Sequence, residues 1–210
     1  VIVSGNDAAV AIAEGLGGTE EAFAQMAQAR AVQIGMTQTT IANASGWPDP
    51  RHRMSLHDLA VLARYLVVDH ADLYHYLGET SFLWNGITQP NRVPLLGAGV
   101  GVDGLKTGHT EEAGYSLVGS ARQGSRRIIF VFSGLASPTE RSEEAERIIG
   151  WAFRQFVERR VLESGQTIAE ADVWLGAAPA VPLVAASDLS ILVPTILPGD
   201  IAARVEYDGP

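Results

Sequence analysis

The sequence contains no cysteine, which excludes disulfide bonds and thiol chemistry and suits a periplasmic or secreted protein. It has no run of about 18 apolar residues, so it predicts no membrane-spanning helix. Positive charge is also scarce, because the formal net charge is −9 and no basic stripe is present. Since nucleic-acid binding usually needs a basic face, we expect no nucleic-acid partner.

Lysine is almost absent as well: of 15 lysine and arginine residues, only Lys106 is a lysine. An ammonium group is a compact charge whose pKa moves on burial, whereas a guanidinium group is planar and stays charged. A chain that otherwise uses arginine therefore indicates a specific need for an ammonium at this position. Lys106 begins the tripeptide Lys106-Thr107-Gly108, so this tripeptide is a candidate functional motif.

Apolar residues make up 47% of the 210-residue chain and charged residues 19%. This composition supports a buried core and argues against a disordered chain. The five histidines, at positions 52, 57, 70, 75 and 109, form no H-E-x-x-H motif and have no cysteine partner. We therefore expect no metal centre and no organic cofactor.

Hydrophobic periodicity and turn signals predict an α+β fold with helices packed on an antiparallel sheet for residues 1–158. Ser4 or Asn6 can cap the first short helix, which ends between Gly15 and Gly18. The other predicted helices cover 19–35, 55–69 and 139–157, and the predicted strands cover 82–84, 102–107, 115–121 and 128–132. The last three strands read as an antiparallel meander.

Residues 159–210 have a different character, with little charge and with valine, alanine and proline in alternation. Turn signals recur at the spacing that is typical of small β-domains. We expect strands at 173–175, 183–184, 189–193 and 201–205. The sequence thus predicts that this part begins a second, all-β domain.

The tripeptide at Lys106 predicts a site for an acyl substrate that carries a carboxylate. The ammonium supplies positive charge where a transition state becomes negative, and the Thr107 hydroxyl can donate to the carboxylate. Gly108 lets a substrate backbone lie against the strand, whose edge offers N–H groups. Ser4 can relay a proton to a leaving amine and Asn6 can orient groups, although Ser-x-Asn also occurs as a plain helix cap.

Four stretches carry a resemblance to a known family: residues 4–14, 84–86, 89–92 and 102–115. They resemble D-alanyl-D-alanine carboxypeptidases, the low-molecular-mass penicillin-binding proteins that act through an acyl-serine, and Lys-Thr-Gly is one of the motifs of that group. The resemblance runs over essentially the whole chain. It implies the β-lactamase and transpeptidase type of fold, followed by the beginning of a C-terminal β-sandwich.

The resemblance also implies roles for individual residues. Ser4 would shuttle a proton, Asn6 would orient the substrate, and Lys106 would polarise Ser4 and bind substrate. The remaining implied substrate-binding residues are Thr107, Gly108, His109 through its backbone N–H in the oxyanion hole, and Arg141 at the terminal carboxylate. Without the resemblance, Arg141 reads as a helix-surface arginine near Glu144 and Glu146.

One motif of the family is missing. Its nucleophile and base lie in an S-x-x-K motif upstream of Ser4, and the single lysine of this chain belongs to Lys-Thr-Gly. Because the chain starts at Val1 without methionine, we expect that an N-terminal segment with that motif lies outside it. The alternative is a pseudoenzyme that binds peptidoglycan without a nucleophile.

The resemblance implies cleavage of the terminal D-alanine from the peptidoglycan stem peptide, with β-lactam antibiotics as covalent inhibitors. It implies a periplasmic location, peripheral to the inner membrane, with a C-terminal anchor beyond this chain. A class A β-lactamase is the second enzymatic reading. That group usually has Asp between Ser and Asn, where this chain has Gly5, and it lacks a trailing β-domain.

Overall fold

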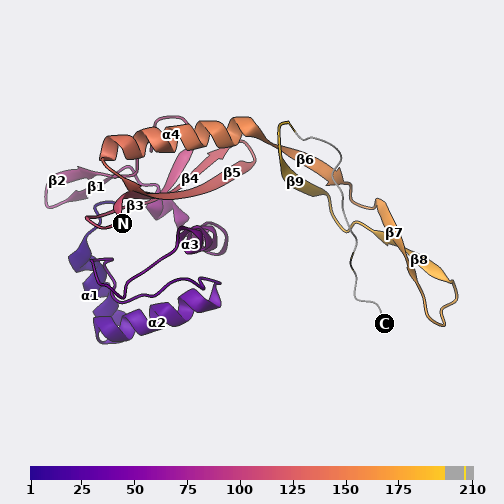
Figure 1. Cartoon of the computed structure of the whole chain (residues 1–210), viewed down its shortest axis with the longest axis horizontal. Helices are drawn as coiled ribbons and strands as arrows, with labels where there is room; N and C mark the ends of the chain where they lie inside the picture. Colours follow the sequence, from indigo (N-terminus) through magenta and orange to yellow (C-terminus); the bar gives the residue numbers. More distant parts are fainter. Residues whose placement is uncertain (197–205, 207–210) are drawn as a thin grey trace. The chain divides into compact units, whose positions relative to one another are not determined.

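A computed structural model gives the structure of the chain and describes residues 1–196 and 206 (Figure 1). The chain divides into two units, Val1–Ile149 and Gly150–Pro210. The first unit combines helices with antiparallel sheets, which confirms the predicted fold class. The division into functional domains at residue 158 stays a prediction. No helix in the described part has the length and apolar character needed to cross a membrane.

Three helices open the first unit: α1 (Asn6–Gly17), α2 (Glu20–Gln33) and α3 (Leu56–Asp69). The two later helices have side-chain caps, because the Thr19 hydroxyl accepts from the Ala22 N–H and the Ser55 hydroxyl accepts from the Asp58 N–H. These bonds satisfy N–H groups that have no partner within the helix.

The predicted cap of α1 is wrong. The N-cap position is Gly5, and no side chain accepts a hydrogen bond from the first turn of the helix. Asn6 is the first residue of the helix instead, and Ser4 lies outside it. The hydroxyl of Ser4 therefore remains available for another partner.

The loop between α2 and α3 is held by a buried carboxylate. Asp58 has no exposed surface, and its carboxylate accepts from the Gln38 N–H at 2.8 Å and from the Thr39 hydroxyl at 2.7 Å. The stretch 55–58 has the spacing of a capping box, which is only half formed because Asp58 uses its oxygens on this loop. The loop itself carries one isolated antiparallel bridge, between Thr40 and Arg53.

A short hairpin follows a 3₁₀ helix, η1 (Tyr74–Leu77), and consists of β1 (Ser81–Trp84) and β2 (Ile87–Pro90). Its two-residue turn has positive φ angles at both central positions, 49° at Asn85 and 76° at Gly86, as the Asn-Gly signal predicts. The second strand was not predicted from the sequence, because its residues do not show an apolar alternation.

The central sheet has the order β3-β4-β5, with β3 (Val102–Thr110), β4 (Gly114–Gln123) and β5 (Arg126–Leu135). All pairings are antiparallel, which confirms the predicted meander. Each strand is longer than predicted, since the ladder extends into polar residues near the turns. Within the described part of the chain, β3 lies at an edge of this sheet.

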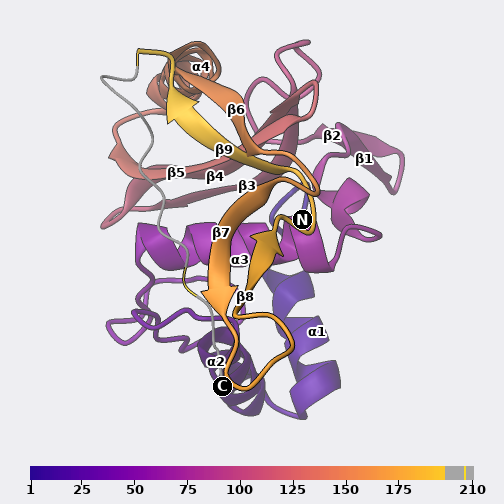
Figure 2. The ribbon, with the colours of Figure 1, turned by 90° about the vertical axis from the view of Figure 1, so that its right-hand side faces the viewer.

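Helices cover both faces of the central sheet. Figures 1 and 2 show α3 on one side and α4 (Pro138–Gln155) on the other. The buried residues of α4 are Arg141, Ala145 and Ile149, which recur every four positions and form one stripe. The helix ends before the predicted residue 157, because Phe156 begins a strand.

The described part of the second unit contains two separate two-stranded antiparallel sheets. One pairs β6 (Phe156–Leu162) with β9 (Leu189–Pro194), and the other pairs β7 (Thr167–Asp172) with β8 (Ala180–Val184). The predicted strand at 173–175 is wrong, since these residues form the turn after β7, with Leu175 at a φ of 56°. The predicted strand at 201–205 lies outside the described residues.

Candidate active site

Strand β3 places Lys106 at the edge of the central sheet. Lys106 pairs with Val118 of β4, while Leu105 on its N-terminal side is only 2% exposed. The following residue, Thr107, is 7% exposed. The lysine side chain therefore starts from a backbone that the hydrophobic core holds firmly.

The ammonium of Lys106 donates a 2.9 Å hydrogen bond to the hydroxyl oxygen of Ser4, 102 residues away in the sequence. It also donates to the backbone carbonyl of Thr107. Ser4 has a φ of 56°, a left-handed conformation that costs a residue with a side chain about 1–3 kcal/mol. Such strain in the backbone is typical of functional sites, so the contact supports the functional reading of Ser4 over the capping one.

The electrostatic environment of Lys106 is positive. Burial lowers the pKa of the Lys106 amine, and the charges of Arg92 and Arg141 lower that pKa further. No carboxylate within residues 1–196 forms an ion pair with any of these three side chains. The arrangement favours an anionic ligand, because a negative charge placed here would relieve the mutual repulsion of the cations.

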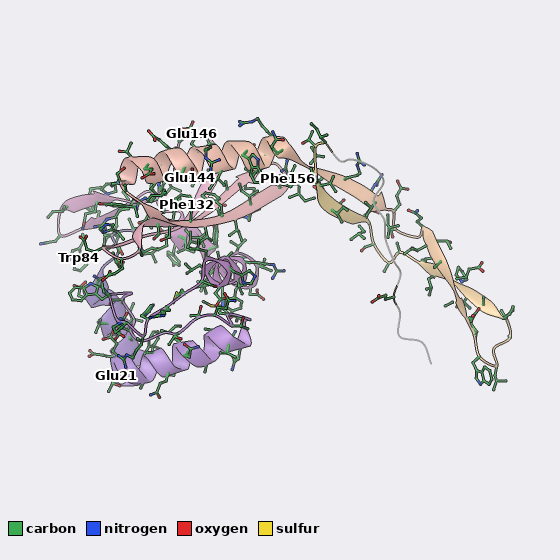
Figure 3. All side chains as sticks on the ribbon, viewed as in Figure 1. Glu21, Trp84, Phe132, Glu144, Glu146 and Phe156 are labelled. Atoms are coloured by element: carbon green, nitrogen blue, oxygen red, sulfur yellow. The ribbon has the colours of Figure 1, made fainter. Side chains whose placement is uncertain are left out.

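Arg141 is a buried residue of α4, with 9% of its surface exposed. Its Nε atom has no hydrogen-bond partner among the described residues, although the great majority of buried polar atoms have one. Figure 3 shows Glu144 and Glu146 on the same helix, but Glu144 pairs with Arg147 at 2.6 Å. The reading of Arg141 as a surface ion-pair residue is therefore wrong.

The guanidinium of Arg141 lies over the ring of Tyr115, with its central carbon 5.6 Å from the ring centroid. Burial lowers the pKa of the Arg141 guanidinium, the ionisable hydroxyl of Tyr115 raises that pKa, and the charge of Arg92 lowers it. Tyr115 is also the direct cross-strand partner of His109, and the two ring centroids are 4.0 Å apart. These contacts connect Arg141 to the end of the strand that carries Lys106.

Of two further predicted site residues, Gly108 packs against a neighbouring strand and Asn6 is exposed. Gly108 pairs with Ser116, and a Cβ atom at Gly108 would approach the Ser116 hydroxyl oxygen to 2.6 Å. The absence of a side chain thus serves the packing of β3 on β4 as well as access to the strand. Asn6 is exposed, and no hydrogen bond joins its side chain to another described residue, Lys106 included.

The structure adds Arg92 and Tyr115 to the site, and neither was singled out from the sequence. Both lie within the stretches 89–92 and 102–115, but an exposed arginine after a proline and a tyrosine in a strand carry no specific signal. For Tyr115, the tight turn after β3 could have indicated its pairing with His109. Among residues 1–196 and 206, no cluster of three or more His, Asp or Glu side chains could hold a metal ion.

Comparison with known proteins identifies the family. The sequence profile of the D-alanyl-D-alanine carboxypeptidases matches residues 1–136. The chain belongs to this family. D-alanyl-D-alanine carboxypeptidase DacD of Escherichia coli is 35% identical over 210 residues, which are 100% of this chain and 54% of the relative. The chain thus spans about half the length of such relatives.

Solved structures of carboxypeptidase-family proteins have the same fold. Penicillin binding protein 5 from Haemophilus influenzae matches with a TM-score of 0.83 and 36% identity, over 93% of this chain and 57% of that protein. Penicillin-binding protein D2 from Listeria monocytogenes, solved in its ampicillin-bound form, matches with a TM-score of 0.67 and 29% identity, over 72% of this chain and 63% of that protein. These matches confirm the fold and the family that the sequence motifs predict.

Proposed function

We propose that the chain forms the substrate-binding half of a serine-type D-alanyl-D-alanine carboxypeptidase, which removes the terminal D-alanine from the peptidoglycan stem peptide. The observation that carries this proposal is the Lys106–Ser4 hydrogen bond beside two arginines that have no carboxylate partner in the described part of the chain. A proton-relaying pair next to an anion-binding cluster is what cleavage at a free C-terminus requires.

The reaction proceeds through an acyl-enzyme. A serine hydroxyl of an S-x-x-K motif, outside this chain, adds to the carbonyl of the last peptide bond while its proton passes to the lysine of that motif, and the C–N bond then breaks to release D-alanine as its amine. Ser4 delivers the proton that the leaving amine needs, and Lys106 supports the transfer because its lowered pKa makes proton exchange easier. Water then hydrolyses the ester and restores the serine.

The other residues hold the substrate. We assign Arg141 and the Thr107 hydroxyl to the terminal carboxylate, and the backbone N–H of His109 to the oxyanion. Gly108 keeps the strand edge open to an extended peptide, and Asn6 orients the substrate once the missing motif completes the site. Support comes from the free Nε of buried Arg141 and from the edge position of β3 within the described sheet.

β-Lactam antibiotics are proposed to acylate the same serine as substrate mimics, because related penicillin-binding proteins are known in ampicillin-bound and cefotaxime-bound forms. Because the proposed substrate is peptidoglycan, we propose a periplasmic location and attachment to the inner membrane through a segment beyond this chain. No cofactor is assigned to the reaction.

Fluorescent penicillin labelling tests the proposal. The chain is joined to, or mixed with, a segment that carries S-x-x-K, and labelling is compared between wild type, Lys106→Ala and the surface control Arg147→Ala. We expect the first variant to lose acylation by a factor of about 100 to 1,000, the typical effect of losing one preorganised stabilising group in a dry site. Lys106→Arg should also be poor, because a guanidinium cannot replace a compact ammonium. Equal labelling of Lys106→Ala and wild type would overturn the site assignment.

A binding-only protein is the second candidate, and one observation favours it: the single lysine of this chain already belongs to Lys-Thr-Gly. Such a protein would hold the stem peptide at the cations Lys106, Arg92 and Arg141 without cleaving it. Intact-mass analysis of the completed protein separates the two functions, because a penicilloyl adduct on a serine of the added segment excludes the binding-only reading.

A further inference from the structure

Arg141 and Arg127 each lie over a tyrosine ring, Tyr115 at 5.6 Å and Tyr74 at 5.1 Å from the guanidinium carbon to the ring centroid, but only Arg127 also pairs with a carboxylate. Arg127, for comparison, forms a two-point ion pair with Asp103, with its Nη2 atom 2.7 Å from one carboxylate oxygen and its Nη1 atom 2.9 Å from the other. Arg141 is more deeply buried than Arg127, yet no carboxylate of the described residues contacts it. Among the described residues, the ring of Tyr115 lies against its guanidinium, 5.6 Å from the central carbon to the ring centroid.

This choice of partner has a chemical consequence. A carboxylate partner accepts from the N–H groups at the edge of a guanidinium and so uses them up. An aromatic ring instead contacts the face of the cation and stabilises the charge, while the N–H groups in the plane remain available. The unpartnered Nε of Arg141 agrees with such a division between face and edge.

Backbone pairing with both neighbouring strands fixes the position of Tyr115. It lies near the start of the central strand β4, where its backbone pairs with His109 on one side and with Leu135 on the other. The ladder toward β5 shifts register between Tyr115 and Leu117, and the His109 ring contacts the tyrosine ring. A side chain held from two strands can fix the position of a long, flexible arginine.

We propose that Tyr115 is a positioning residue that determines selectivity for a free C-terminal carboxylate, by holding the face of Arg141 and leaving its edge for the ligand. This inference rests on the proposed function of Arg141. It assigns to Tyr115 no contact with the reacting atoms. The ligand class is a peptide that ends in D-alanyl-D-alanine with an ionised carboxylate.

Peptide binding to the 210-residue chain tests the proposal without any acylation step. Nuclear magnetic resonance titrations give the dissociation constants of N-acetyl-L-lysyl-D-alanyl-D-alanine and of its C-terminal amide. The ratio of the two constants measures selectivity for the carboxylate. Tyr115→Leu should reduce this ratio by about tenfold, in the range expected for a desolvated cation–π contact. Tyr115→Phe, which keeps the aromatic face, should retain it within about twofold.

A matched control exists in the same unit. Arg30 lies over the ring of Tyr65 with its central carbon 5.2 Å from the centroid, far from Lys106 in the sequence and outside the site. Tyr65→Leu removes this more exposed pair, in which Arg30 also donates to the Tyr65 hydroxyl, and should leave the ratio unchanged. General damage to the fold would weaken the binding of both peptides equally and would not move their ratio.

The outcomes separate this inference from the function on which it rests. If the wild-type chain binds the acid and the amide equally, or binds neither, the role of Arg141 in the proposed function fails and the inference fails with it. If the wild-type chain prefers the acid and Tyr115→Leu keeps the full preference, only the inference about Tyr115 is overturned. A loss of preference in Tyr115→Phe as well would show that the hydroxyl, not the ring face, is responsible, and would also overturn it.

Discussion

A polar network at the start of β3 supports the strand that carries Lys106, and its removal gives a quantitative test of the structure. The carboxylate of Asp103 accepts from the Tyr74 hydroxyl at 2.8 Å and forms the two-point ion pair with Arg127. Arg127 also donates to the hydroxyl of Ser120, which is fully buried, at 2.6 Å. Burial raises the pKa of the Tyr74 hydroxyl to about 12, so it remains a donor. The network joins η1, β3, β4 and β5.

Asp103→Ala removes three hydrogen bonds to a charged acceptor and leaves the Arg127 cation without its partner. Each such bond contributes about 1.5–3 kcal/mol when buried. About a third of the Asp103 side chain and a quarter of the Arg127 side chain are exposed, and solvent weakens the interaction. We therefore expect a total loss of about 2–4 kcal/mol in the free energy of unfolding. Asp103→Asn keeps one acceptor and should lose about half as much. Tyr74→Phe should lose about 1 kcal/mol.

Urea unfolding followed by circular dichroism measures these losses, and a double-mutant cycle with Arg127→Ala isolates the pair. We expect a coupling energy of about 1–3 kcal/mol for residues that share one network. Glu144→Ala serves as the control, because the Glu144–Arg147 pair on α4 has a partner that is 68% exposed and should contribute about 0.5 kcal/mol or less. A coupling between Asp103 and Arg127 below about 0.5 kcal/mol would refute the claim that this network anchors β3.

Three further predictions address the site. Selective ¹³C labelling of lysine gives one signal, from Lys106, whose pKa should lie below the usual value of 10.5 because burial disfavours the charged amine. The folded state then binds fewer protons than the unfolded state. In thermal unfolding, wild type should therefore gain stability relative to Lys106→Met as the pH rises from the folded-state pKa to 10.5. The 210-residue chain alone should show no penicilloyl adduct by intact mass, since Ser4 has no second lysine to activate it; an adduct on Ser4 would reveal another nucleophile system. In urea unfolding, Gly119→Ala should lower the free energy of unfolding by about 1–3 kcal/mol, because its Cβ would lie 2.3 Å from the Phe130 ring. Gly108→Ala should lower it less, because the Ser116 hydroxyl can rotate away. Equal losses of stability in the two variants would contradict this packing.

The elements of the first unit were predictable where periodicity and turn chemistry agree. The α3 helix has a serine cap, an apolar stripe and a clear end, and its predicted range of 55–69 differs from the structure by one residue. Prediction failed where apolar content misleads. Trp174 and Leu175 look like strand residues, yet they lie in a turn and are 83% and 89% exposed. Composition alone cannot separate a buried apolar cluster from one at the tip of a hairpin.

The site was predictable only in part, because its contacts join residues that are distant in the sequence. Lys106 stands out by its rarity, and Ser4 by its motif, but the hydrogen bond between them depends on how the segment before α1 lies against β3. Arg141 was expected from its family position, whereas its burial over Tyr115 depends on the packing of α4 on the sheet. No local pattern marks an aromatic ring as the partner of a cation on another element.

The site combines several features that each oppose stability. Ser4 has a strained backbone, Arg141 has a buried atom without a partner, and Lys106 lies near two other cations. Proteins generally compensate buried charge with paired groups, as Asp103 and Arg127 do beside this site. Lys106 and Arg141 have no carboxylate partner among the described residues, at the place where a ligand carboxylate would provide one. Binding of the substrate carboxylate would therefore also relieve the repulsion between the cations. An anionic ligand should for this reason raise the thermal stability of the chain, and an amidated ligand of the same size should raise it less.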